Sequence, residues 1–338
     1  MKNTLVTGGA GFIGSHTVVE LAQAGYRPVI VDNFSNSEKS VPEQIESIIG
    51  SKVPVYEGDF QDEKLLANIF SKEKIDGVIH FAAYKAVGES VANPLKYYQN
   101  NVSGLISLLE LLDKYKIYNF VFSSSAAVYG EPPVKLVTED TKCSPTSPYG
   151  WSKYMDEVIL RDTCAAVPEF KGIALRYFNV VGSHSSAKIG ELPKGRPQNL
   201  LPLIVQACTG QIPPLTVFGT DYPTPDGTCL RDYIHVVDLA RAHVAAIDKI
   251  FTQEDIGYDV FNIGTGKPSS VLELIKAFEK VNKVKVPYKL GPRRLGDPVA
   301  YYASAVKANK QLGWHAKKTV ADAVADAWRW QQKISKTS

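Results

Sequence analysis

Few cysteines, almost no net charge and no long apolar run limit the classes of protein to which this chain can belong. The 338 residues contain four cysteines (143, 164, 208 and 229), and none forms the C-x-x-C pair of a metal or redox site. We therefore expect reduced thiols and a cytoplasmic protein. Lys and Arg number 38 against 35 Asp and Glu, so no general field attracts nucleic acid or an anionic membrane.

Targeting, membrane-spanning and metal-binding patterns are also missing. The first apolar run, TLVTGG, starts at Thr4 and runs into glycines, so we expect no signal peptide. No stretch approaches the ~20 apolar residues of a membrane span. The six histidines have no i, i+4 or H-E-x-x-H spacing, and we therefore expect no metal site.

The chain does contain short apolar, β-branched runs that alternate with longer amphipathic stretches. The runs are TLVTG, PVIVDN, VPVYEGD, GVIHFAA, NFVFSSS and IALRYFNV, and the stretches between them are 12–24, 62–72, 94–115 and 149–166. Strands that alternate with helices predict βαβ units. The predicted fold class is therefore α/β, with a doubly wound parallel sheet (a Rossmann fold).

After Asn179 the alternation loosens, which predicts a second, smaller lobe of mixed α/β structure. Residues 183–231 are rich in Pro, Gly and Ser, and 287–300 is expected to be a loop. A helix capped by Ser269 or Ser270 is expected before VLELIKAFEKV. We expect a dinucleotide-binding domain of residues 1–178 plus 233–263, and a substrate-binding domain of residues 179–232 plus 264–338.

The segment VTGGAGFIGSH follows the first strand and opens the first helix. Gly9, Gly11 and Gly14 fit G-x-G-x-x-G, while Gly8, Gly11 and Gly14 fit the related G-x-x-G-x-x-G. Without Cβ atoms the backbone can approach a pyrophosphate at the helix N-terminus. Asp32 ends the second predicted strand, where a carboxylate accepts hydrogen bonds from ribose hydroxyls and repels a 2′-phosphate. The pattern predicts NAD rather than NADP.

A second group of residues is predicted to gather at the nicotinamide end of that cofactor. Ser123, Ser124 and Ser125 end the fifth strand, and Tyr149 and Lys153 lie one turn apart on the next helix. A free phenol has a pKa of about 10 and is a poor base at neutral pH. We expect Lys153 and the positive nicotinamide ring to favour the phenolate and lower that pKa.

These residues and several longer motifs resemble the extended short-chain dehydrogenase/reductase family, and in particular its nucleotide-sugar epimerase branch. The resemblance covers nearly the whole chain through TGGAGFIGSH, VIHFAAYKAVGES, FSSSAAVYG, SPYGWSK, LRYFNVVG, RDYIHVVDL, FNIGTG and PRRLGD. It implies reversible interconversion of UDP-galactose and UDP-glucose, in which hydride leaves the sugar C4 for tightly bound NAD and returns on the other face. Helices 94–115 and 149–166 carry apolar residues on more than one face, which fits the homodimer that the resemblance implies and is also explained by burial within the monomer.

The resemblance assigns roles to individual residues. Tyr149 would exchange the proton of the 4-hydroxyl, Lys153 would also hold the nicotinamide ribose, and Ser125 would hydrogen-bond the reacting oxygen. The implied cofactor-binding residues are Gly8, Gly11, Phe12, Ile13, Gly14, Asp32, Asn33, Ser37, Asp59, Phe60, Phe81, Ala82, Lys85, Asn100, Ser125, Tyr149, Lys153 and Phe178. The implied substrate-binding residues are Asn179, Asn199, Leu200, Phe218, Arg231, Arg294, Asp297 and Tyr301.

Several readings of individual residues stay open. Phe218 is equally explained by core packing, and Arg293 by a solvated surface charge. Tyr301 is expected to crowd an N-acetyl group on the second carbon of the sugar. Val180 and Ala127 depart from the commonest family pattern of Pro and Thr, but leave the reacting groups intact.

Three other functions are compatible with parts of the sequence. The same fold could epimerise another UDP-sugar, such as an N-acetylhexosamine, a uronate or a pentose. A 4,6-dehydratase would be expected to carry Asp-Glu after the strand-five hydroxyl, where this chain has Ala126 and Ala127. A non-catalytic NAD-binding scaffold would keep the glycines but would have no need of Tyr149, Lys153 and a strand-end serine together.

Overall fold

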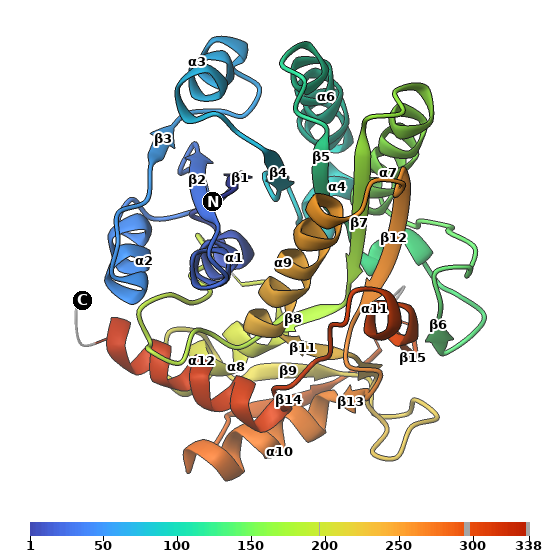
Figure 1. The fold of residues 1–338 in the computed structure, drawn as a ribbon. Coiled ribbons are helices and arrows are strands. Elements are labelled where there is room, and N and C mark those ends of the chain that lie inside the picture. The colour runs from blue at the N-terminus through green and yellow to red at the C-terminus, as the bar shows by residue number, and fades with distance from the viewer. Residues whose placement is uncertain (196, 294–297, 336–338) are drawn as a thin grey trace.

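The structure, a computed structural model, describes residues 1–195, 197–293 and 298–335. Its main sheet is built from β1 (Asn3–Thr7), β2 (Arg27–Asp32), β3 (Val55–Glu57), β4 (Gly77–His80), β5 (Asn119–Ser123), β7 (Lys171–Tyr177) and β12 (Tyr258–Ile263). These seven strands lie in the order β12-β7-β5-β4-β1-β2-β3, and every neighbouring pair is parallel (Figure 1). The winding reverses between β1 and β4. The predicted doubly wound parallel sheet is confirmed.

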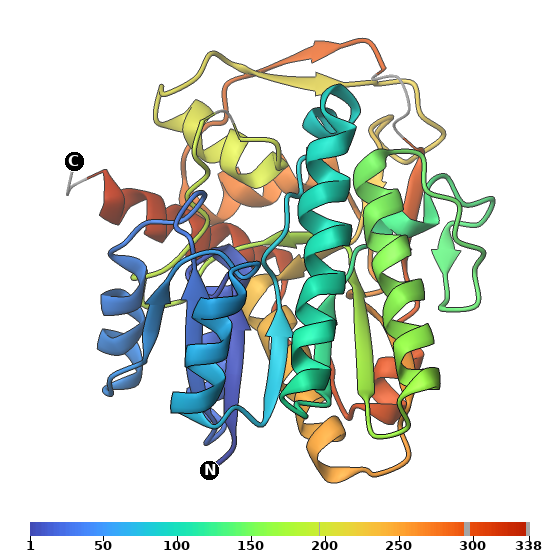
Figure 2. The ribbon, with the colours of Figure 1, turned by 90° about the horizontal axis from the view of Figure 1, so that it is seen from above.

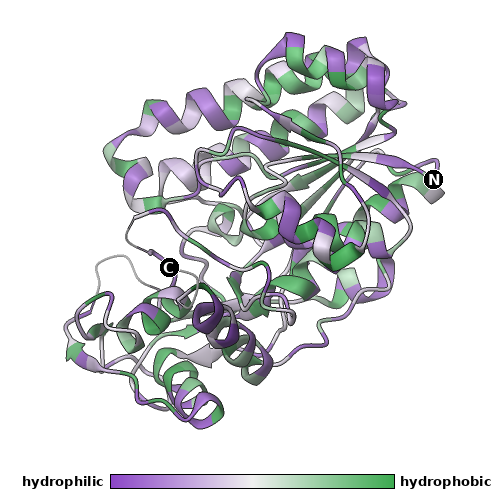
Figure 3. Cartoon of the chain, turned by 90° about the vertical axis from the view of Figure 1, so that its left-hand side faces the viewer, coloured by the Kyte–Doolittle hydropathy of each residue, from purple (hydrophilic) through white to green (hydrophobic). Residues whose placement is uncertain are grey.

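Helices cover both faces of this sheet, and each face has its own core. One face carries α1 (Phe12–Gln23), α2 (Val41–Ile49) and α9 (Val236–Thr252), and the other carries α3 (Glu63–Glu73), α6 (Gly104–Lys114) and α7 (Pro148–Ala166). The strands that are buried on both faces are mainly apolar, as Val78 and Ile79 of β4 illustrate. Figure 3 shows this apolar colouring along the strands.

The stretch predicted as one helix over 94–115 is a composite. The chain runs through α4 (Val87–Ala92), α5 (Pro94–Tyr97) and a π-helical segment, η1 (Tyr98–Ser103), before it continues as α6. The rod that contains η1 and α6 lies beside α7, as Figure 2 shows in teal and green. Ser147 caps α7 by accepting a hydrogen bond from the Gly150 amide (3.2 Å), and Pro148 starts the helix, so the first turn that carries Tyr149 is well defined.

The second lobe packs around its own apolar cluster. Its helices are α8 (Leu200–Cys208), α10 (Val271–Asn282) and α12 (Val320–Ile334), and two strand pairs lie with them, β8 (Asn179–Val181) with β11 (Tyr233–His235) and β9 (Leu215–Phe218) with β14 (Tyr288–Gly291). A further sheet has the order β13 (Ser269–Ser270), β10 (Leu230–Arg231), β15 (Ala300–Ala303) and β6 (Leu136–Val137), and short helices η2 (Ala126–Tyr129) and α11 (Val306–Gln311) complete the described elements.

One local prediction for this lobe is confirmed and one is wrong. Ser270 caps α10 in a reciprocal capping box with Glu273, as the sequence indicated. The segment 287–300, expected to be a loop, instead contains β14, which pairs with β9. Figure 2 shows these two strands, β14 in orange and β9 in yellow, at the outer edge of the lobe. Pro287, Gly291 and Pro292 make this segment look like a loop, whereas its strand conformation comes from pairing with residues far away in the sequence.

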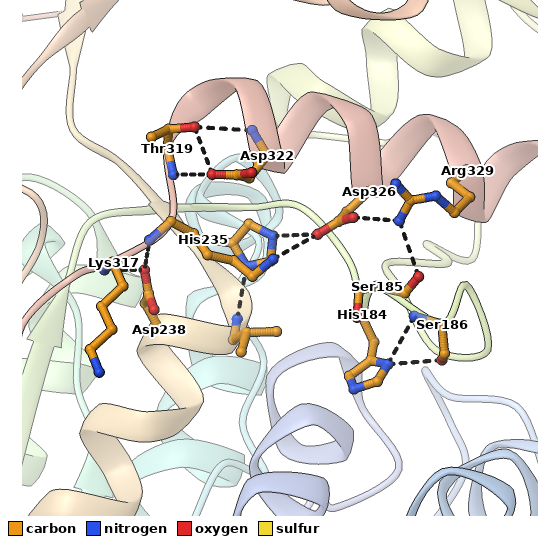
Figure 4. A network of polar contacts seen from close by, with 12 residues as sticks. His184, Ser185, Ser186, His235, Asp238, Lys317, Thr319, Asp322, Asp326 and Arg329 are labelled. Atoms are coloured by element: carbon orange, nitrogen blue, oxygen red, sulfur yellow. Dashed lines mark hydrogen bonds and ion pairs between the residues drawn. The ribbon is translucent and has the colours of Figure 1, made fainter.

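A polar network fastens α12 to the rest of the molecule (Figure 4). Asp326 of α12 is 4% exposed and contacts His235 at the start of α9, Lys318 and Arg329. Arg329 also donates to the carbonyl of Ser185 (3.0 Å). The network therefore holds α12 against both α9 and the loop that begins near residue 183.

The described residues offer neither a disulfide nor a metal cluster. The four cysteines are free thiols, two of them buried and two half-buried. Within the same residues, His, Cys, Asp and Glu side chains do not gather into a group that could hold a metal ion. No helix in the described ranges is both long and apolar enough to cross a bilayer.

Candidate active site

A cavity of about 920 Å³ lies beyond the carboxyl ends of the central strands. Its floor contains residues at or just after the ends of five strands, namely Gly8, Asp32, Phe81, Ser123 and Tyr177. This edge, around the point where the winding reverses, is where ligands bind in doubly wound sheets. The loop over 189–194 and the last turns of α12 form part of the opposite wall.

The glycine loop between β1 and α1 forms a cradle that a side chain would fill. Gly8 has φ +70°, a conformation that favours glycine. A Cβ at Gly14 would lie 2.2 Å from the Gly8 carbonyl oxygen, and one at Gly11 would lie 3.2 Å from it. Among the described residues no side chain caps α1 at Gly11, so its first amides are available at the cavity. This arrangement fits a pyrophosphate.

Asp32 lies at the end of β2 with its carboxylate held in a defined orientation. Its Oδ1 accepts from the Phe34 amide and the Ser37 hydroxyl, and its Oδ2 accepts from the Ala10 amide, all at 2.9 Å. The side chain lines the cavity although the residue is only 8% exposed. A carboxylate has about four acceptor sites, so one remains for a ligand donor such as a ribose hydroxyl.

Tyr149 and Lys153 meet the end of β5, as their spacing predicted. Lys153 is 3% exposed, and its ammonium donates to the Ser123 carbonyl (2.9 Å) and lies 4.6 Å from the centre of the Phe122 ring. The Ser123 hydroxyl hydrogen-bonds the Tyr177 hydroxyl (2.7 Å). Tyr149 is also buried, and its phenol interacts with Ser125. A phenol, an ammonium and serine hydroxyls therefore converge at one place.

The acid–base balance of this centre differs from the sequence expectation. Burial raises the pKa of Tyr149 to about 12, although the contact with Ser125 acts in the opposite direction. The predicted lowering of the Tyr149 pKa by Lys153 is therefore wrong for the protein groups alone. Burial also lowers the pKa of Lys153 to about 8, against the opposing effect of Asp156 and Glu157. For both groups, desolvation by burial is the largest cause of the shift in pKa.

Most of the predicted cofactor residues line the cavity, and most predicted substrate residues do not. The predicted residues in its wall are Gly8, Gly11, Phe12, Ile13, Gly14, Asp32, Asn33, Ser37, Phe60, Phe81, Ala82, Lys85, Asn100, Tyr149, Lys153 and Asn199. Those outside its wall are Asp59, Ser125, Phe178, Asn179, Leu200, Phe218, Arg231 and Tyr301. Asp59 remains close, because it accepts a hydrogen bond from Asn33 (3.1 Å). Arg294 and Asp297 lie outside the described residues.

Part of the second group lies together next to the phenol of Tyr149. Tyr301 pairs with Arg231 across β15 and β10, and its ring lies 5.5 Å from the Phe178 ring and 5.8 Å from the Arg231 guanidinium. Tyr301 also interacts electrostatically with Tyr149. Phe218, on β9, is 42% exposed, so the alternative explanation by core packing is wrong.

The cavity wall also contains residues that the sequence analysis did not single out. Tyr177 ends β7, so the rule that selected the end of β5 would have found it. Glu191 and Trp330 had no local signal. Glu191 accepts from the Asn199 amide group (2.8 Å) and lies 3.7 Å from the Lys85 ammonium, and its carbonyl accepts from the Trp330 indole (3.2 Å). Only the folded chain brings these three segments together.

Comparison with known proteins identifies the family. Residues 4–264 match the NAD dependent epimerase/dehydratase family, and the chain belongs to it. UDP-glucose 4-epimerase of Neisseria meningitidis serogroup A is 50% identical over 331 residues, which cover 98% of this chain and 97% of that protein. The bifunctional UDP-glucose 4-epimerase and UDP-xylose 4-epimerase 3 of Arabidopsis thaliana is 49% identical over 336 residues, covering 98% and 96%.

A solved structure extends the likeness to three dimensions. The crystal structure of UDP-glucose 4-epimerase from Bifidobacterium longum, in complex with NAD⁺ and UDP, is 48% identical, covers 100% of both chains and superimposes with a TM-score of 0.94. The likeness therefore extends over the second lobe and is not confined to the parallel sheet.

Proposed function

We propose that the protein interconverts UDP-galactose and UDP-glucose by epimerisation at C4 of the sugar, with NAD held tightly as cofactor. The observation that carries the proposal is the convergence of Tyr149, Lys153 and the β5 serines in the same cavity as the glycine cradle. Relatives about half identical over nearly the whole chain, named UDP-glucose 4-epimerases, support it. The reaction leaves no net redox change.

The protein groups account for the proton and the orientation of the sugar. Tyr149 exchanges the proton of the 4-hydroxyl, while Ser125 hydrogen-bonds the same oxygen. When bound, NAD accepts and returns the hydride, and its positive ring favours ionisation of the Tyr149 phenol. Lys153, whose ammonium donates to the Ser123 carbonyl, would hold the nicotinamide ribose. Burial of these groups strengthens their electrostatic interactions with the substrate.

The second lobe would bind the UDP moiety. We assign the nucleotide sugar to Asn179, Asn199, Leu200, Phe218, Arg231 and Tyr301, together with Arg294 and Asp297. A guanidinium such as that of Arg231 suits a diphosphate because it offers several donors in a plane. The proposed division places residues 1–178 and 233–263 in the NAD-binding domain and the remaining segments in the substrate domain.

Another UDP-sugar is the alternative substrate that a specific observation favours. The Arabidopsis relative is named for both UDP-glucose and UDP-xylose, so a pentose without the sixth carbon is a reasonable second substrate. An N-acetyl sugar is disfavoured by the aromatic ring of Tyr301, which is packed against Phe178.

We also propose a cytoplasmic homodimer. Helices α4 to α6 and α7 expose apolar side chains to solvent, namely Val87, Val91, Leu95, Ile106, Trp151 and Met155, with Leu95 79% exposed. Adjacent apolar side chains on neighbouring helices are typical of an interface between copies. Sedimentation or light scattering of the pure protein tests this, and a monomer at micromolar concentration contradicts it.

The test of the function uses the pure protein alone. Incubation with UDP-galactose, with no added cofactor, is expected to give UDP-glucose until the two reach equilibrium. Heat denaturation is expected to release about one NAD per chain, because a tightly bound ligand copurifies with the native state. A protein that contains NAD but leaves UDP-galactose unchanged contradicts the substrate, and a protein free of NAD contradicts the proposal as a whole.

A further inference from the structure

Glu157 is a buried charged residue beside the catalytic centre that the mechanism above does not use. It lies on α7, one turn beyond Lys153, and is only 2% exposed. Its Oε1 accepts a hydrogen bond from the Ser124 hydroxyl. Ser124 is fully buried and lies between Ser123, which binds Lys153, and Ser125, which faces Tyr149.

The Glu157 carboxylate is fixed from its other side by Arg176 of β7. The Arg176 Nε donates to both carboxylate oxygens (2.9 and 3.1 Å), and its Nη2 donates to Oε2 (2.6 Å). Arg176 is 5% exposed and also donates to the Tyr129 hydroxyl (2.9 Å). A bidentate, buried pair of this kind has little freedom to move.

Tyr149, Lys153 and Glu157 form one stripe on α7, because they are spaced by four residues. Two of them hold consecutive residues at the end of β5, Lys153 through the Ser123 carbonyl and Glu157 through the Ser124 hydroxyl. The first member of the stripe, Tyr149, then meets the third serine, Ser125. The register between α7 and β5 therefore determines where the phenol lies.

We propose that Glu157 is a positioning residue for the epimerisation: its hydrogen bond with Ser124 fixes α7 against β5, so that Tyr149 meets Ser125 at the reacting oxygen. This inference rests on the proposed function. It assigns Ser124 to the positioning of α7, whereas Ser125 contacts the reacting oxygen. Displacement by about 1 Å costs up to about 100-fold in rate when proton and hydride must move together.

Glu157 also contributes to the charge that surrounds Lys153. The ionisable groups around that ammonium come from α7, β4 and β7, namely Tyr149, Asp156, Glu157, His80, Arg176 and Tyr177. The negative charge of Glu157 raises the pKa of Lys153, so its removal is expected to lower that pKa further. Loss of the Ser124 hydroxyl leaves the charge in place.

Two variants separate the positioning effect from the charge effect. Ser124→Ala is expected to lower kcat for UDP-galactose by about 30-fold or more, with KM within about threefold and the NAD content unchanged. Glu157→Gln keeps an oxygen that can accept from Ser124 but removes the charge, so it is expected to shift the alkaline limb of kcat/KM to lower pH, which Ser124→Ala leaves in place, and to lower kcat by less than Ser124→Ala does. Ser152→Ala is the matched control, because Ser152 is a fully buried serine of α7 whose hydroxyl contacts Asn101 and the Tyr149 carbonyl and not β5. Its kcat is expected to stay within about threefold of the unmodified protein.

Full kcat in Ser124→Ala overturns the proposal, as does a loss of NAD or a rise in KM that accounts for the whole effect. A crystal structure of Ser124→Ala gives a readout that does not depend on the substrate: α7 is expected to move away from the end of β5. An unmoved α7 overturns the positioning role. Absence of turnover in the unmodified protein counts against the proposed function only, and the position of α7 then still decides this inference.

Discussion

The dinucleotide-binding sheet and the second lobe place their candidate site residues in different ways. In the sheet, Gly8, Asp32 and Ser123 reach one cavity because parallel strands end at the same edge. In the second lobe, Arg231 and Tyr301 become neighbours only because β10 pairs with β15, which is some 70 residues further along the chain. The sheet therefore positions the proposed reacting groups through topology, whereas the lobe positions the proposed substrate-binding residues through long-range pairing. We expect substitutions in the first to change kcat and those in the second to change which sugar is accepted.

The strongest test of that contrast is Tyr149→Phe. Loss of the phenolic hydroxyl removes the group proposed to exchange the substrate proton, so kcat for UDP-galactose is expected to fall at least about 1,000-fold. NAD content and UDP binding, measured by heat release and calorimetry, are expected to stay unchanged. Tyr154→Phe is the control, since that half-buried tyrosine lies on the same helix outside the cavity wall. Retention of kcat within tenfold would remove Tyr149 from the proposed mechanism.

The sequence predicted those parts of the site that depend on strand order and helix spacing. Tyr149, Lys153 and Asp32 were found because each follows from a local pattern whose position in a doubly wound sheet is known. The same rule covers Tyr177, which was overlooked at the end of β7. Glu191 could not be found, because its contacts with Asn199 and Lys85 exist only after the chain has folded.

The same physical limit explains the errors. The strand β14 was missed since its hydrogen bonds come from β9 and not from its own Pro- and Gly-rich sequence. The pKa of Tyr149 was expected to fall because of Lys153 and the positive nicotinamide ring, but burial cannot be measured from a sequence pattern, and among the protein groups desolvation raises that pKa to about 12. Energetic quantities of buried groups require the packed structure.

A smaller effect, confined to specificity, is expected in the second lobe. Tyr301→Cys removes the ring that packs beside Phe178 and creates space near the second carbon of the sugar. We expect kcat/KM for UDP-N-acetylgalactosamine to rise by about tenfold relative to UDP-galactose, since a pocket change of this size is worth about 1–3 kcal/mol. Turnover of UDP-galactose is expected to change by no more than a few fold. Equal turnover of acetylated and plain sugars by the unmodified protein would contradict the role of Tyr301.

The smallest effect on function is expected from a substitution in the network that fastens α12 (Figure 4). Its main effect is expected to be on the stability of the protein. Burial tends to raise the pKa of Asp326, but hydrogen bonds from His235 and Lys318 hold it at about 2 instead of its usual 3.8. A shift of that size corresponds to about 2 kcal/mol of folding free energy. Asp326→Asn is therefore expected to lower the free energy of unfolding by about 2 kcal/mol at neutral pH. Because Asp326 lies outside the cavity wall, although Trp330 on the same helix lines it, kcat is expected to change by no more than a few fold.

The pH dependence of the Asp326 variant gives the decisive comparison. A carboxylate whose folded-state pKa is lowered contributes its stability above the unfolded pKa and loses it as pH falls through the folded value. The difference in unfolding free energy between the unmodified protein and Asp326→Asn should therefore be constant above about pH 5 and shrink between about pH 4 and pH 2. Urea titrations at several pH values measure it, with Asp162→Asn as the control because that carboxylate is exposed and forms an ion pair with its neighbour Arg161. A difference that does not vary with pH would show that the network acts through packing and not through the charge of Asp326. The contrast between a lobe fixed by long-range polar contacts and a sheet fixed by topology would then lose one of its supports.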